Sequence, residues 1–395
     1  MKIAFLTAGG IAPCLSASIG SLIKKYNEVL PDSKMIGYLN GYKGLLTGNS
    51  IEISDSIRSK TKVLFKYGGS PIGNSRVKLT NIDDCIRKRF IKEGEDPLKV
   101  AADQLIKDGV NILHTIGGDD TNTMAAQLSF YLKNNNYNLT VVGLPKTVDN
   151  DVYPIKQTLG AWTAAEQGAK FFDNIVNENT TSSRQLIIHE VMGRNCGWLT
   201  AYTAKEYLKI LDKKTFLPEI NLSRDRWGID AIYIPEIPIN FDQECFRLKN
   251  IMDEKDCVNI FLSEGAGTQT IIEEMRLNGE EISQDAFGHV ALDKLNPGQW
   301  FSKKFSEKLL AEKTLVQKSG YFARSAAANS KDLELIKKSG SFGAEMAFKG
   351  KSGVVGLDDK NGELSLIDFK RIKGGKPFNF NVKWYGDMLK NIGQE

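Results

Sequence analysis

Two short acidic motifs, each behind an apolar run, hold the residues best suited to chemistry. The first, GGDDT at 117–121, stands between an expected strand and an expected helix. Glycines let the backbone approach a phosphate, and the N–H groups that open a helix favour an anion. A carboxylate meets phosphate only through a hard cation such as Mg²⁺, which binds both kinds of oxygen. The motif therefore predicts Gly118 beside phosphate and Asp119 as a magnesium ligand; the alternative is that Asp119 and Asp120 merely cap the helix.

The second motif, PKTVDND at 145–151, follows another apolar run close behind the first. Phosphoryl transfer to a hydroxyl needs a carboxylate to accept the proton, a cation to offset charge on the transferred group, and Mg²⁺ to bridge phosphate oxygens. Asp149 or Asp151, Lys146 and Asp119 are suited to these three tasks in turn. The alternative is a turn rich in Asp and Asn, which does not explain the lysine between strand and carboxylates.

Four further segments carry a glycine or a basic side chain behind an expected strand or turn. Gly9 belongs to a glycine pair after the first apolar run, and Arg76 closes the glycine-rich loop GGSPIGNSR. Arg194 ends the motif MGR, and Tyr321 with Arg324 follows a glycine. Arginine binds phosphate oxygens through paired N–H groups, so these segments predict further anion contacts. The alternatives are tight turns for the glycines and solvated or ion-paired surface positions for the arginines.

The composition restricts the class of protein and of partner. The chain has 395 residues, 41% hydrophobic and 25% charged, with 52 Lys and Arg against 48 Asp and Glu. Such a chain is too apolar to be disordered, and a net charge of +4 is too small to predict nucleic-acid binding. No apolar run reaches the ~18–20 residues of a membrane span, and the start lacks signal-peptide features. We therefore expect a cytoplasmic protein without nucleic-acid or membrane partners, in which any anion is bound locally.

Cysteine and histidine are not arranged for disulfides or metal binding. The five cysteines are odd in number and form no C-x-x-C pair, which indicates reduced, mostly buried thiols. His114 and His189 lie inside apolar runs and His289 is isolated, so we expect core packing with a satisfied hydrogen bond. The motifs G-x-x-x-x-G-K-[ST] and G-x-S-x-G are both absent. The chemistry is left to carboxylates, lysine, arginine and Mg²⁺.

Short apolar runs rich in isoleucine and valine are the elements that must position these motifs. Most are followed by a glycine-bearing turn and an amphipathic stretch, which is typical of βα units around a parallel sheet and predicts an α/β fold. Ligands bind at the carboxyl ends of strands in such sheets, where the polar motifs stand. The segment 353–369 differs, because two alternating runs flank a turn and predict a β-hairpin. The apolar runs span residues 2–10, 111–118, 139–145, 185–193 and 259–265.

Taken together and in order, the motifs resemble those of the phosphofructokinase family. The resemblance spans most of the chain, whereas a lone GGD would be weak, because NAD kinases and diacylglycerol kinases also carry one. Pyrophosphate-dependent members have Asp and Lys where ATP-dependent members have two glycines, and here these positions are Asp120 and Lys146. The motifs are GG at 9–10, GNSR at 73–76, GGDDT at 117–121, PKTVDND at 145–151, MGR at 192–194, SEGAG at 263–267 and GYFAR at 320–324.

A physical argument agrees with the pyrophosphate-dependent type. A carboxylate at Asp120 places negative charge and bulk where the α-phosphate of ATP would lie, and Lys146 would instead face the groups of pyrophosphate. The resemblance implies Mg²⁺-dependent, reversible transfer of phosphate from pyrophosphate to the 1-hydroxyl of fructose 6-phosphate. The products would be fructose 1,6-bisphosphate and orthophosphate.

The resemblance also assigns roles to individual residues. Asp149 is implied as the base that takes the 1-hydroxyl proton, Asp151 orients the site or holds metal-bound water, and Thr147 hydrogen-bonds the sugar or phosphate. The residues implied to bind the phosphoryl donor and its Mg²⁺ are Gly9, Arg76, Gly118 and Asp119. Those implied to bind the sugar are Met192, Gly193, Arg194 and Glu264. The 6-phosphate is implied to be bound by Tyr321 and Arg324.

The resemblance further implies the phosphofructokinase fold, with two Rossmann-like lobes built on parallel sheets. Residues 1–160 plus 323–375 form the expected phosphoryl-donor lobe, and residues 161–322 plus 376–395 form the expected sugar-phosphate lobe. The family also implies a homodimer or homotetramer.

Two alternatives of different classes remain open. An ATP- or polyphosphate-dependent kinase of another sugar phosphate, or of NAD, shares the GGD motif but should lack Lys146 and the MGR motif. A non-catalytic sugar-phosphate-binding protein does not need both Asp119 and Asp149. A panel of phosphoryl donors and acceptors, assayed with Mg²⁺ in both directions, separates these classes.

Overall fold

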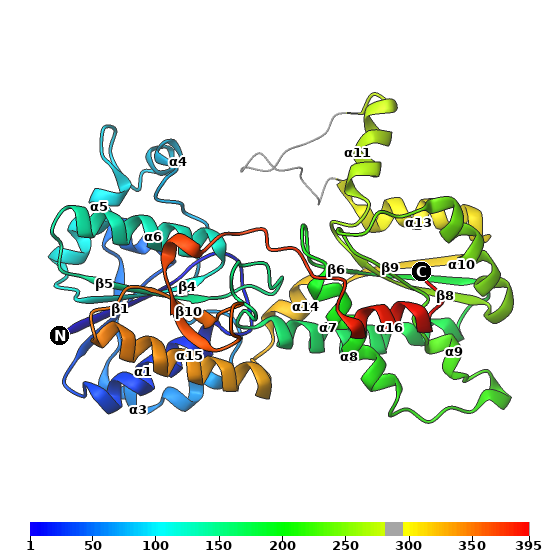
Figure 1. The fold of residues 1–395 in the computed structure, drawn as a ribbon, viewed down its shortest axis with the longest axis horizontal. Coiled ribbons are helices and arrows are strands. Elements are labelled where there is room, and N and C mark those ends of the chain that lie inside the picture. The colour runs from blue at the N-terminus through cyan, green and yellow to red at the C-terminus, as the bar shows by residue number, and fades with distance from the viewer. Residues whose placement is uncertain (281–294, 395) are drawn as a thin grey trace. The chain divides into compact units, whose positions relative to one another are not determined.

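The computed structural model describes residues 1–280 and 295–394, which fold as two compact units. Each unit is assembled from two separate stretches, so the chain passes from one unit to the other three times. Unit 1 comprises Met1–Thr163 and Arg324–Lys376, and unit 2 comprises Ala164–Ala323 and Pro377–Glu395. Both units carry helices on the two faces of a largely parallel sheet, which confirms the predicted α/β class (Figure 1).

Unit 1 is built on a seven-stranded sheet. Across the sheet the strands are β11 (Leu364–Ile367), β10 (Gly353–Leu357), β5 (Thr140–Pro145), β4 (Ile112–Gly117), β1 (Lys2–Thr7), β2 (Lys34–Tyr38) and β3 (Ser50–Glu52). The inner strands are parallel, and β3 and β11 pair antiparallel at the edges. Every residue of β4 is buried, as expected for a parallel strand with both faces covered.

Helices cover both faces of this sheet (Figure 1). On one face lie α2 (Tyr42–Thr47), α5 (Pro97–Lys107) and α6 (Asp119–Asn134), and on the other lie α1 (Leu15–Val29) and α15 (Ser330–Phe348). Shorter helical segments are α3 (Asp55–Ser59), η1 (Thr61–Lys66), α4 (Ile82–Arg87) and η4 (Phe369–Arg371). The start of α5 follows from its sequence, because Asp96 accepts the Leu98 N–H at 3.0 Å and Pro97 takes the first helical position.

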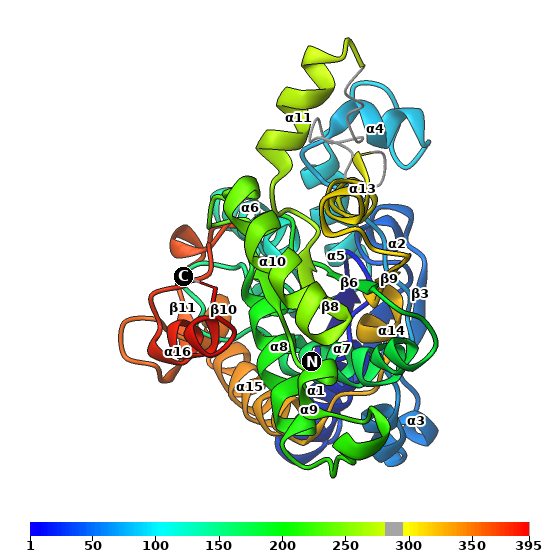
Figure 2. The same ribbon diagram turned by 90° about the vertical axis from the view of Figure 1, so that its right-hand side faces the viewer.

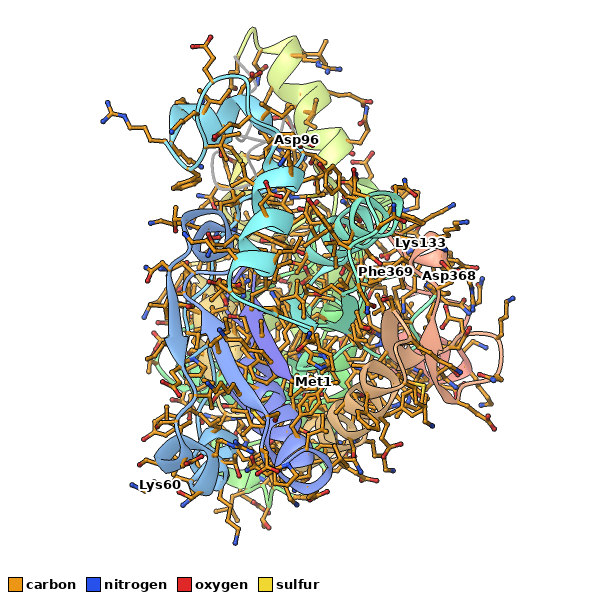
Figure 3. The ribbon with its side chains drawn as sticks, turned by 90° about the vertical axis from the view of Figure 1, so that its left-hand side faces the viewer. Met1, Lys60, Asp96, Lys133, Asp368 and Phe369 are labelled. Carbon is orange, nitrogen blue, oxygen red and sulfur yellow. The ribbon has the colours of Figure 1, made fainter. Side chains whose placement is uncertain are left out.

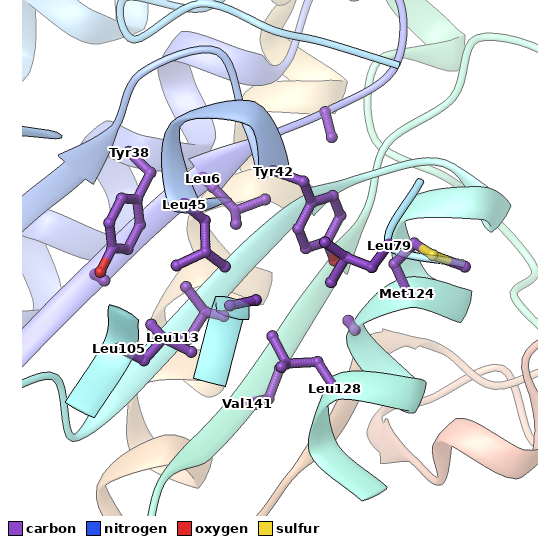
Figure 4. Packing of buried hydrophobic residues seen from close by; sticks show 14 of the residues in the cluster. Leu6, Tyr38, Tyr42, Leu45, Leu79, Leu105, Leu113, Met124, Leu128 and Val141 are labelled. Carbon is purple, nitrogen blue, oxygen red and sulfur yellow. The ribbon is translucent and has the colours of Figure 1, made fainter. Parts of the chain in front are cut away.

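A continuous apolar core fills the space between the sheet and the helices α2, α5 and α6 (Figure 4). Leu6 and Leu113 project from central strands, Leu45 comes from α2, Leu105 from α5 and Leu128 from α6, and all five are fully buried. Burying one leucine side chain contributes roughly 1.5–3 kcal/mol. This core holds α6 against β4 and so fixes the turn between them.

The second stretch of unit 1 holds the far end of α6 (Figure 3). Lys133, in the last turn of α6, lies beside Asp368 and Phe369 at the start of η4. The side chain of Asp368 accepts the Lys370 N–H at 2.8 Å, and Phe369 is buried. Residues far apart in the sequence therefore complete the surroundings of this helix.

Unit 2 is built on a four-stranded parallel sheet. Across the sheet the strands are β7 (Ala231–Tyr233), β8 (Cys257–Ser263), β6 (Gln185–Val191) and β9 (Lys313–Lys318). The register pairs Val191 with Ser263, so the loops after β6 and β8 begin at the same level. The edge strand β9 is only partly buried, and the lysines at its ends, Lys313 and Lys318, form ion pairs with Glu178 and Glu190.

Helices also cover both faces of this second sheet (Figure 2). On one face lie α10 (Phe241–Lys255) and α13 (Pro297–Leu309), and on the other lie α7 (Ala161–Ile175), α8 (Trp198–Leu211), α9 (Arg224–Trp227) and α16 (Lys383–Asn391). The connections contain η2 (Val176–Thr180), η3 (Pro218–Ile220), α11 (Thr268–Leu277) and α14 (Gly320–Ser325). Aromatic rings fill the interior, where Phe172 lies 4.7 Å from Tyr207 and 4.5 Å from Phe261 between ring centroids.

The predicted hairpin at 353–369 is confirmed. Strands β10 and β11 pair antiparallel, with Val354 opposite Ile367 and Leu357 opposite Leu364. The turn is closed by the Gly362 N–H, which donates to the Asp358 carbonyl at 2.7 Å. β10 also pairs with β5, so the hairpin extends the sheet of unit 1.

The expectation for the histidines is confirmed for His114 and wrong in part for His189. Both are fully buried in strands, and Nε2 of His114 lies 2.7 Å from the Tyr26 hydroxyl. Neither ring nitrogen of His189 has a hydrogen-bond partner among residues 1–280 and 295–394. The rings of Phe172 and Phe261 pack on it, and burial lowers its pKa to about 3, so the imidazole stays neutral. His289 lies outside the described residues.

Two further observations concern the whole described chain. The five cysteines are free thiols and four of them are buried, as expected. Within residues 1–280 and 295–394, no helix has the length and apolar character needed to cross a membrane.

Candidate active site

The first acidic motif lies where β4 ends and α6 begins. Gly118 is the N-cap residue, and Asp119 and Asp120 occupy the first turn of the helix. The amide of Asn122 holds this turn by donating to the carbonyls of Gly117 and Gly118 at 3.0 and 2.8 Å. The alternative in which the aspartates cap the helix is therefore wrong. Their carboxylates stand in the first turn, where the helix dipole favours negative charge.

Asp120 forms an ion pair with a lysine that follows the glycine-rich loop. The Lys78 ammonium lies 2.8 Å from Oδ1 of Asp120, whose side chain is 63% exposed. An exposed ion pair contributes only ~0–1 kcal/mol, so the pair orients the carboxylate more than it stabilises the fold. The motifs missed Lys78, although its place two residues after Arg76 was a signal in the sequence.

Lys146, at the end of β5, is a buried cation. Its residue is 5% exposed, its ammonium donates to the Gly10 carbonyl at 2.8 Å, and its backbone N–H donates to the Gly117 carbonyl at 2.7 Å. Burial lowers the pKa of Lys146 from its usual 10.5 to about 8. At Gly9 the backbone has φ +84°, and an added Cβ would lie 3.1 Å from the ammonium. Glycine at this position therefore leaves room for the lysine head group.

The second acidic motif folds back on itself beside the first. The Thr147 hydroxyl lies 3.2 Å from Oδ1 of Asp151 and accepts the Asp149 N–H at 3.2 Å. Asn150 has a left-handed backbone, φ 57°, and supplies the turn that the alternative reading expected. Burial, together with the neighbouring carboxylates of Asp149 and Asp119, raises the pKa of Asp151 to about 7. The structure thus gathers three carboxylates from two strand ends.

Two arginines stand near Lys146. Nε of Arg324 donates to the Ile11 carbonyl at 2.8 Å, and a Cβ added at Gly10 would lie 2.0 Å from its Nη2. Both Arg324 and Arg76 act to lower the pKa of Lys146. Three cationic side chains therefore share one neighbourhood with the carboxylates.

The predicted pair of Tyr321 and Arg324 divides between the two units. Arg324 is the first residue of the second stretch of unit 1 and lies against Gly10. Tyr321 belongs to unit 2 and is 79% exposed. The structure thus places Arg324, but not Tyr321, among the residues predicted for the donor.

In unit 2, the loops after β6 and β8 pack backbone against backbone. The Gly193 N–H donates to Oε1 of Glu264 at 3.2 Å, and the Ser263 hydroxyl donates to the Gly193 carbonyl at 2.6 Å. A Cβ added at Gly265 would lie 1.8 Å from the Arg194 carbonyl oxygen. Met192, which precedes Gly193, lies in the same loop, so these contacts bring the predicted sugar-binding residues together.

A pocket of about 620 Å³ lies beside these loops. Glu236, which the motifs missed, lines it and accepts the Gly197 N–H at 2.9 Å and the Phe378 N–H at 2.7 Å. Glu236 thus ties the loop after β6 to the last stretch of the chain. Its contact with Phe378 joins residues 142 positions apart, which no local pattern signals. The lining consists of Arg194, Asn195, residues 235–239, Gly265 and residues 267–270.

The residues of unit 1 fit a magnesium ion shared with phosphate. Asp119, Asp149 and Asp151 lie close enough to raise the pKa of Asp151, so a cation among them would offset like charges. Among residues 1–280 and 295–394, no three Asp, Glu, His or Cys side chains are arranged to hold a metal by themselves. Mg²⁺ is commonly bound by one or two carboxylates with water and substrate phosphate completing its octahedron. This donor set suits such an arrangement.

Comparisons with known proteins agree with the motifs. A family model described as phosphofructokinase matches residues 2–346. A pyrophosphate–fructose 6-phosphate 1-phosphotransferase of Methylomonas methanica is 59% identical over 394 residues, which cover 100% of this chain and 96% of that protein. A protein of the same name from Propionibacterium freudenreichii subsp. shermanii is 56% identical over 394 residues, with 100% and 98% covered.

A solved structure shows the same fold. The crystal structure of a pyrophosphate-dependent phosphofructokinase from Marinobacter aquaeolei matches with a TM-score of 0.71 and 19% identity, over 99% of this chain and 91% of that chain. The family match covers every motif from Gly9 to Arg324. This chain belongs to the phosphofructokinase family.

Proposed function

We propose that this protein transfers a phosphoryl group from pyrophosphate to the 1-hydroxyl of fructose 6-phosphate, reversibly and with Mg²⁺. The observation that carries the proposal is the grouping of Asp119, Asp149 and Asp151 with the buried Lys146 in unit 1. Relatives 52–59% identical over 99–100% of this chain are named for this reaction. The products are fructose 1,6-bisphosphate and orthophosphate, which joins the enzyme to glycolysis and gluconeogenesis.

Unit 1 is proposed to bind the donor. Lys146 and Arg76 offset the charge of pyrophosphate, and Gly9 and Gly118 allow its oxygens to approach the backbone. Asp120, oriented by Lys78, disfavours a nucleotide because its carboxylate would repel an α-phosphate. Pyrophosphate has no third phosphate and no nucleoside, so it avoids this repulsion. These features support pyrophosphate over ATP.

Asp149 is proposed as the general base. It accepts the proton of the 1-hydroxyl while the hydroxyl oxygen forms a bond to the terminal phosphorus and the bridging P–O bond of pyrophosphate breaks. Orthophosphate leaves with the bridging oxygen, and its charge is offset by Lys146. Thr147, which accepts the Asp149 N–H, holds the turn and hydrogen-bonds the sugar or phosphate.

Asp119 is proposed to hold Mg²⁺, and Asp151 to orient the turn or a water of the metal shell. Held there, Mg²⁺ would supply positive charge to offset the charge that develops on the transferred phosphate. Burial raises the pKa of Asp151, and the charges of Asp149 and Asp119 raise it further, which supports this division of roles.

Unit 2 is proposed to bind the sugar phosphate. The loop of Met192, Gly193 and Arg194 contacts Glu264 and borders the pocket of about 620 Å³, which supports a site for a polar ligand. Tyr321, in unit 2, keeps the 6-phosphate role that the family resemblance assigns, and Arg324 keeps the same assigned role although it belongs to unit 1 and lies against Gly10. The resemblance adds a homodimer or homotetramer to the proposal, and sedimentation velocity measures that state.

The test is a donor panel with the purified protein, fructose 6-phosphate and Mg²⁺. We expect turnover with pyrophosphate, and the reverse reaction with fructose 1,6-bisphosphate and phosphate. Turnover with ATP alone contradicts the choice of donor, and binding of fructose 6-phosphate without turnover under any donor contradicts catalysis. The double variant Asp120→Gly with Lys146→Gly is expected to lose pyrophosphate activity and to gain ATP activity relative to the wild type. Unchanged kinetics with pyrophosphate contradict both assigned roles.

A further inference from the structure

The last stretch of unit 1 runs alongside the acidic turn. Lys373 and Tyr153 exchange two backbone hydrogen bonds, at 2.8 and 2.9 Å, and the Lys376 N–H donates to the Asp151 carbonyl at 2.9 Å. We call residues 373–376 the strap. One end is fixed to Tyr153, just after the acidic turn, and the other to Asp151, the last residue of that turn, so the residues between them are held at a defined place.

Gly374, inside the strap, lies against the side chain of Asp119. A Cβ added at Gly374 would lie 2.0 Å from Oδ2, 2.8 Å from Cγ and 3.0 Å from Cβ of Asp119. Nonbonded carbon and oxygen atoms are most stable at about 3.5 Å or more, so any side chain at 374 has to displace the carboxylate. All three contacts are with the side chain of Asp119 and none is with the backbone, so a methyl group there acts on this side chain first.

The backbone does not require glycine at position 374. Its φ lies outside the left-handed region, whereas the next residue, Gly375, has φ +74° and nothing within 4 Å of an added Cβ. The two positions of the strap therefore favour glycine for different reasons. At position 375 the left-handed backbone favours glycine, and at position 374 a side chain would occupy the space of the Asp119 carboxylate.

We infer that Gly374 is a positioning residue for Asp119: by lacking a side chain it leaves the carboxylate in its place, near the turn that carries Asp149 and Asp151. The strap is hydrogen-bonded to the turn that carries these two residues, and it also touches Asp119. It therefore fixes the Asp119 carboxylate relative to the base. This inference rests on the proposed function, in which Asp119 holds the metal.

The experiment is a double-mutant cycle in the full chain with Gly374→Ala, Asp119→Ala and the double variant. Mn²⁺ affinity in the presence of pyrophosphate is measured by electron paramagnetic resonance, and the melting temperature by circular dichroism. Altering a residue that orients a metal ligand typically costs ~10–100-fold in affinity, so Gly374→Ala is expected to lose at least about ten-fold. Added to Asp119→Ala, it is expected to cost less than about two-fold, because Oδ2 and Cγ, the two atoms that an added Cβ would approach most closely, are gone.

The matched control is Gly375→Asn, which changes the same strap where an added side chain meets nothing. Asparagine tolerates the left-handed backbone, so Mn²⁺ affinity is expected to stay within about two-fold of the wild type. Equal losses at 374 and 375 overturn the inference, because distortion of the strap would then explain both. Losses that add in the cycle, or wild-type affinity in Gly374→Ala, overturn it as well.

Two outcomes need separate interpretation. If Gly374→Ala does not fold, the double variant is expected to fold, because the crowding at Asp119 is removed; a double variant that is equally unfolded overturns the inference. If the wild type binds Mn²⁺ but does not turn over pyrophosphate and fructose 6-phosphate, the proposed function fails. The same titrations then still decide whether Gly374 acts through Asp119.

Discussion

An ammonium group loses hydration when it is buried, and Lys146 is buried beside two arginines with a backbone carbonyl as its hydrogen-bond acceptor. The cost appears in its pKa, which burial lowers from 10.5 to about 8. This difference corresponds to about 3 kcal/mol that the charged form loses on folding at neutral pH. A residue kept at such a cost is more easily explained by a phosphate partner than by stability.

The pH dependence of stability tests this view of Lys146. Between pH 8 and 10.5 the unfolded chain keeps the proton that the folded protein has lost, so the free energy of unfolding rises with pH in this window. Relative to Lys146→Met, the wild type is expected to gain about 2 kcal/mol between ~pH 7 and ~pH 9.5, measured by urea unfolding. The exposed Lys107→Met serves as control. Parallel pH curves for the wild type and Lys146→Met contradict the buried charge.

The role of Asp149 gives a second prediction at this scale. Asp149→Asn keeps the size of the side chain and removes the proposed base, so kcat is expected to fall ~10²- to 10⁴-fold with little change in melting temperature. Asp83→Asn, on α4, removes a carboxylate elsewhere in unit 1 and is expected to leave kcat unchanged. Near-native turnover of Asp149→Asn in a stopped assay for fructose 1,6-bisphosphate contradicts the assignment.

At the scale of elements, the site is made by loops that begin at the ends of neighbouring strands. In unit 2 the register of β6 with β8 starts both loops together, and Gly265 lets them meet at the Arg194 carbonyl. In unit 1 the Lys146 N–H donates to the carbonyl that ends β4, so the two acidic turns are joined by a backbone hydrogen bond. The strand pairing in each sheet thus sets the positions at which the loops of the site begin.

Gly265 provides the prediction at this scale. A methyl group there meets the backbone of Arg194 and has to move the loop, and a shift of about 1 Å can cost ~100-fold in catalytic efficiency. Gly265→Ala is expected to raise KM for fructose 6-phosphate while KM for pyrophosphate changes little. The control Gly386→Ala places a methyl group in α16 where nothing lies within 4 Å. A rise in KM for pyrophosphate alone contradicts the assignment of this loop to the sugar.

Sequence reasoning predicted the elements whose pattern is local. The apolar strands with their glycine turns and the hairpin at 353–369 follow from periodicity and turn chemistry, which act over a few residues. It did not predict the ion pair of Lys78 with Asp120, the hydrogen bond from the Gly197 N–H to Glu236, or the strap. These contacts join segments that are distant in the sequence. It also assigned His189 a hydrogen bond, although a neutral imidazole can be stabilised by aromatic packing alone.

At the scale of the molecule, neither unit is a continuous piece of chain. Strands β10 and β11, from the second stretch, complete the sheet of unit 1, and the segment after Lys376 completes unit 2. In that segment Phe378, Tyr385 and Met388 are buried, and the side chain of Gln394 accepts the Ile232 N–H at 2.8 Å. The last residues therefore belong to the core of unit 2.

Removal of residues 377–395 is expected to destabilise the protein severely. Each of the three buried side chains contributes roughly 1.5–3 kcal/mol, a large share of the ~5–15 kcal/mol that stabilises a typical domain. The truncated chain should therefore be recovered as aggregate or melt well below the wild type in calorimetry. The exposed variant Lys383→Ala, in the same segment, should melt like the wild type. A truncated chain with the wild-type melting temperature contradicts this account.

The edge strand β9 has a consequence for the behaviour of the protein at high concentration. An open strand edge is a template for pairing with a second chain, and natural proteins protect such edges with charge, especially lysine. β9 begins and ends with a lysine, Lys313 and Lys318, and each is paired with a glutamate, Glu178 or Glu190. A strand from another molecule would have to displace these pairs. The two ends of β9 therefore carry the kind of charge that protects open strand edges in natural proteins.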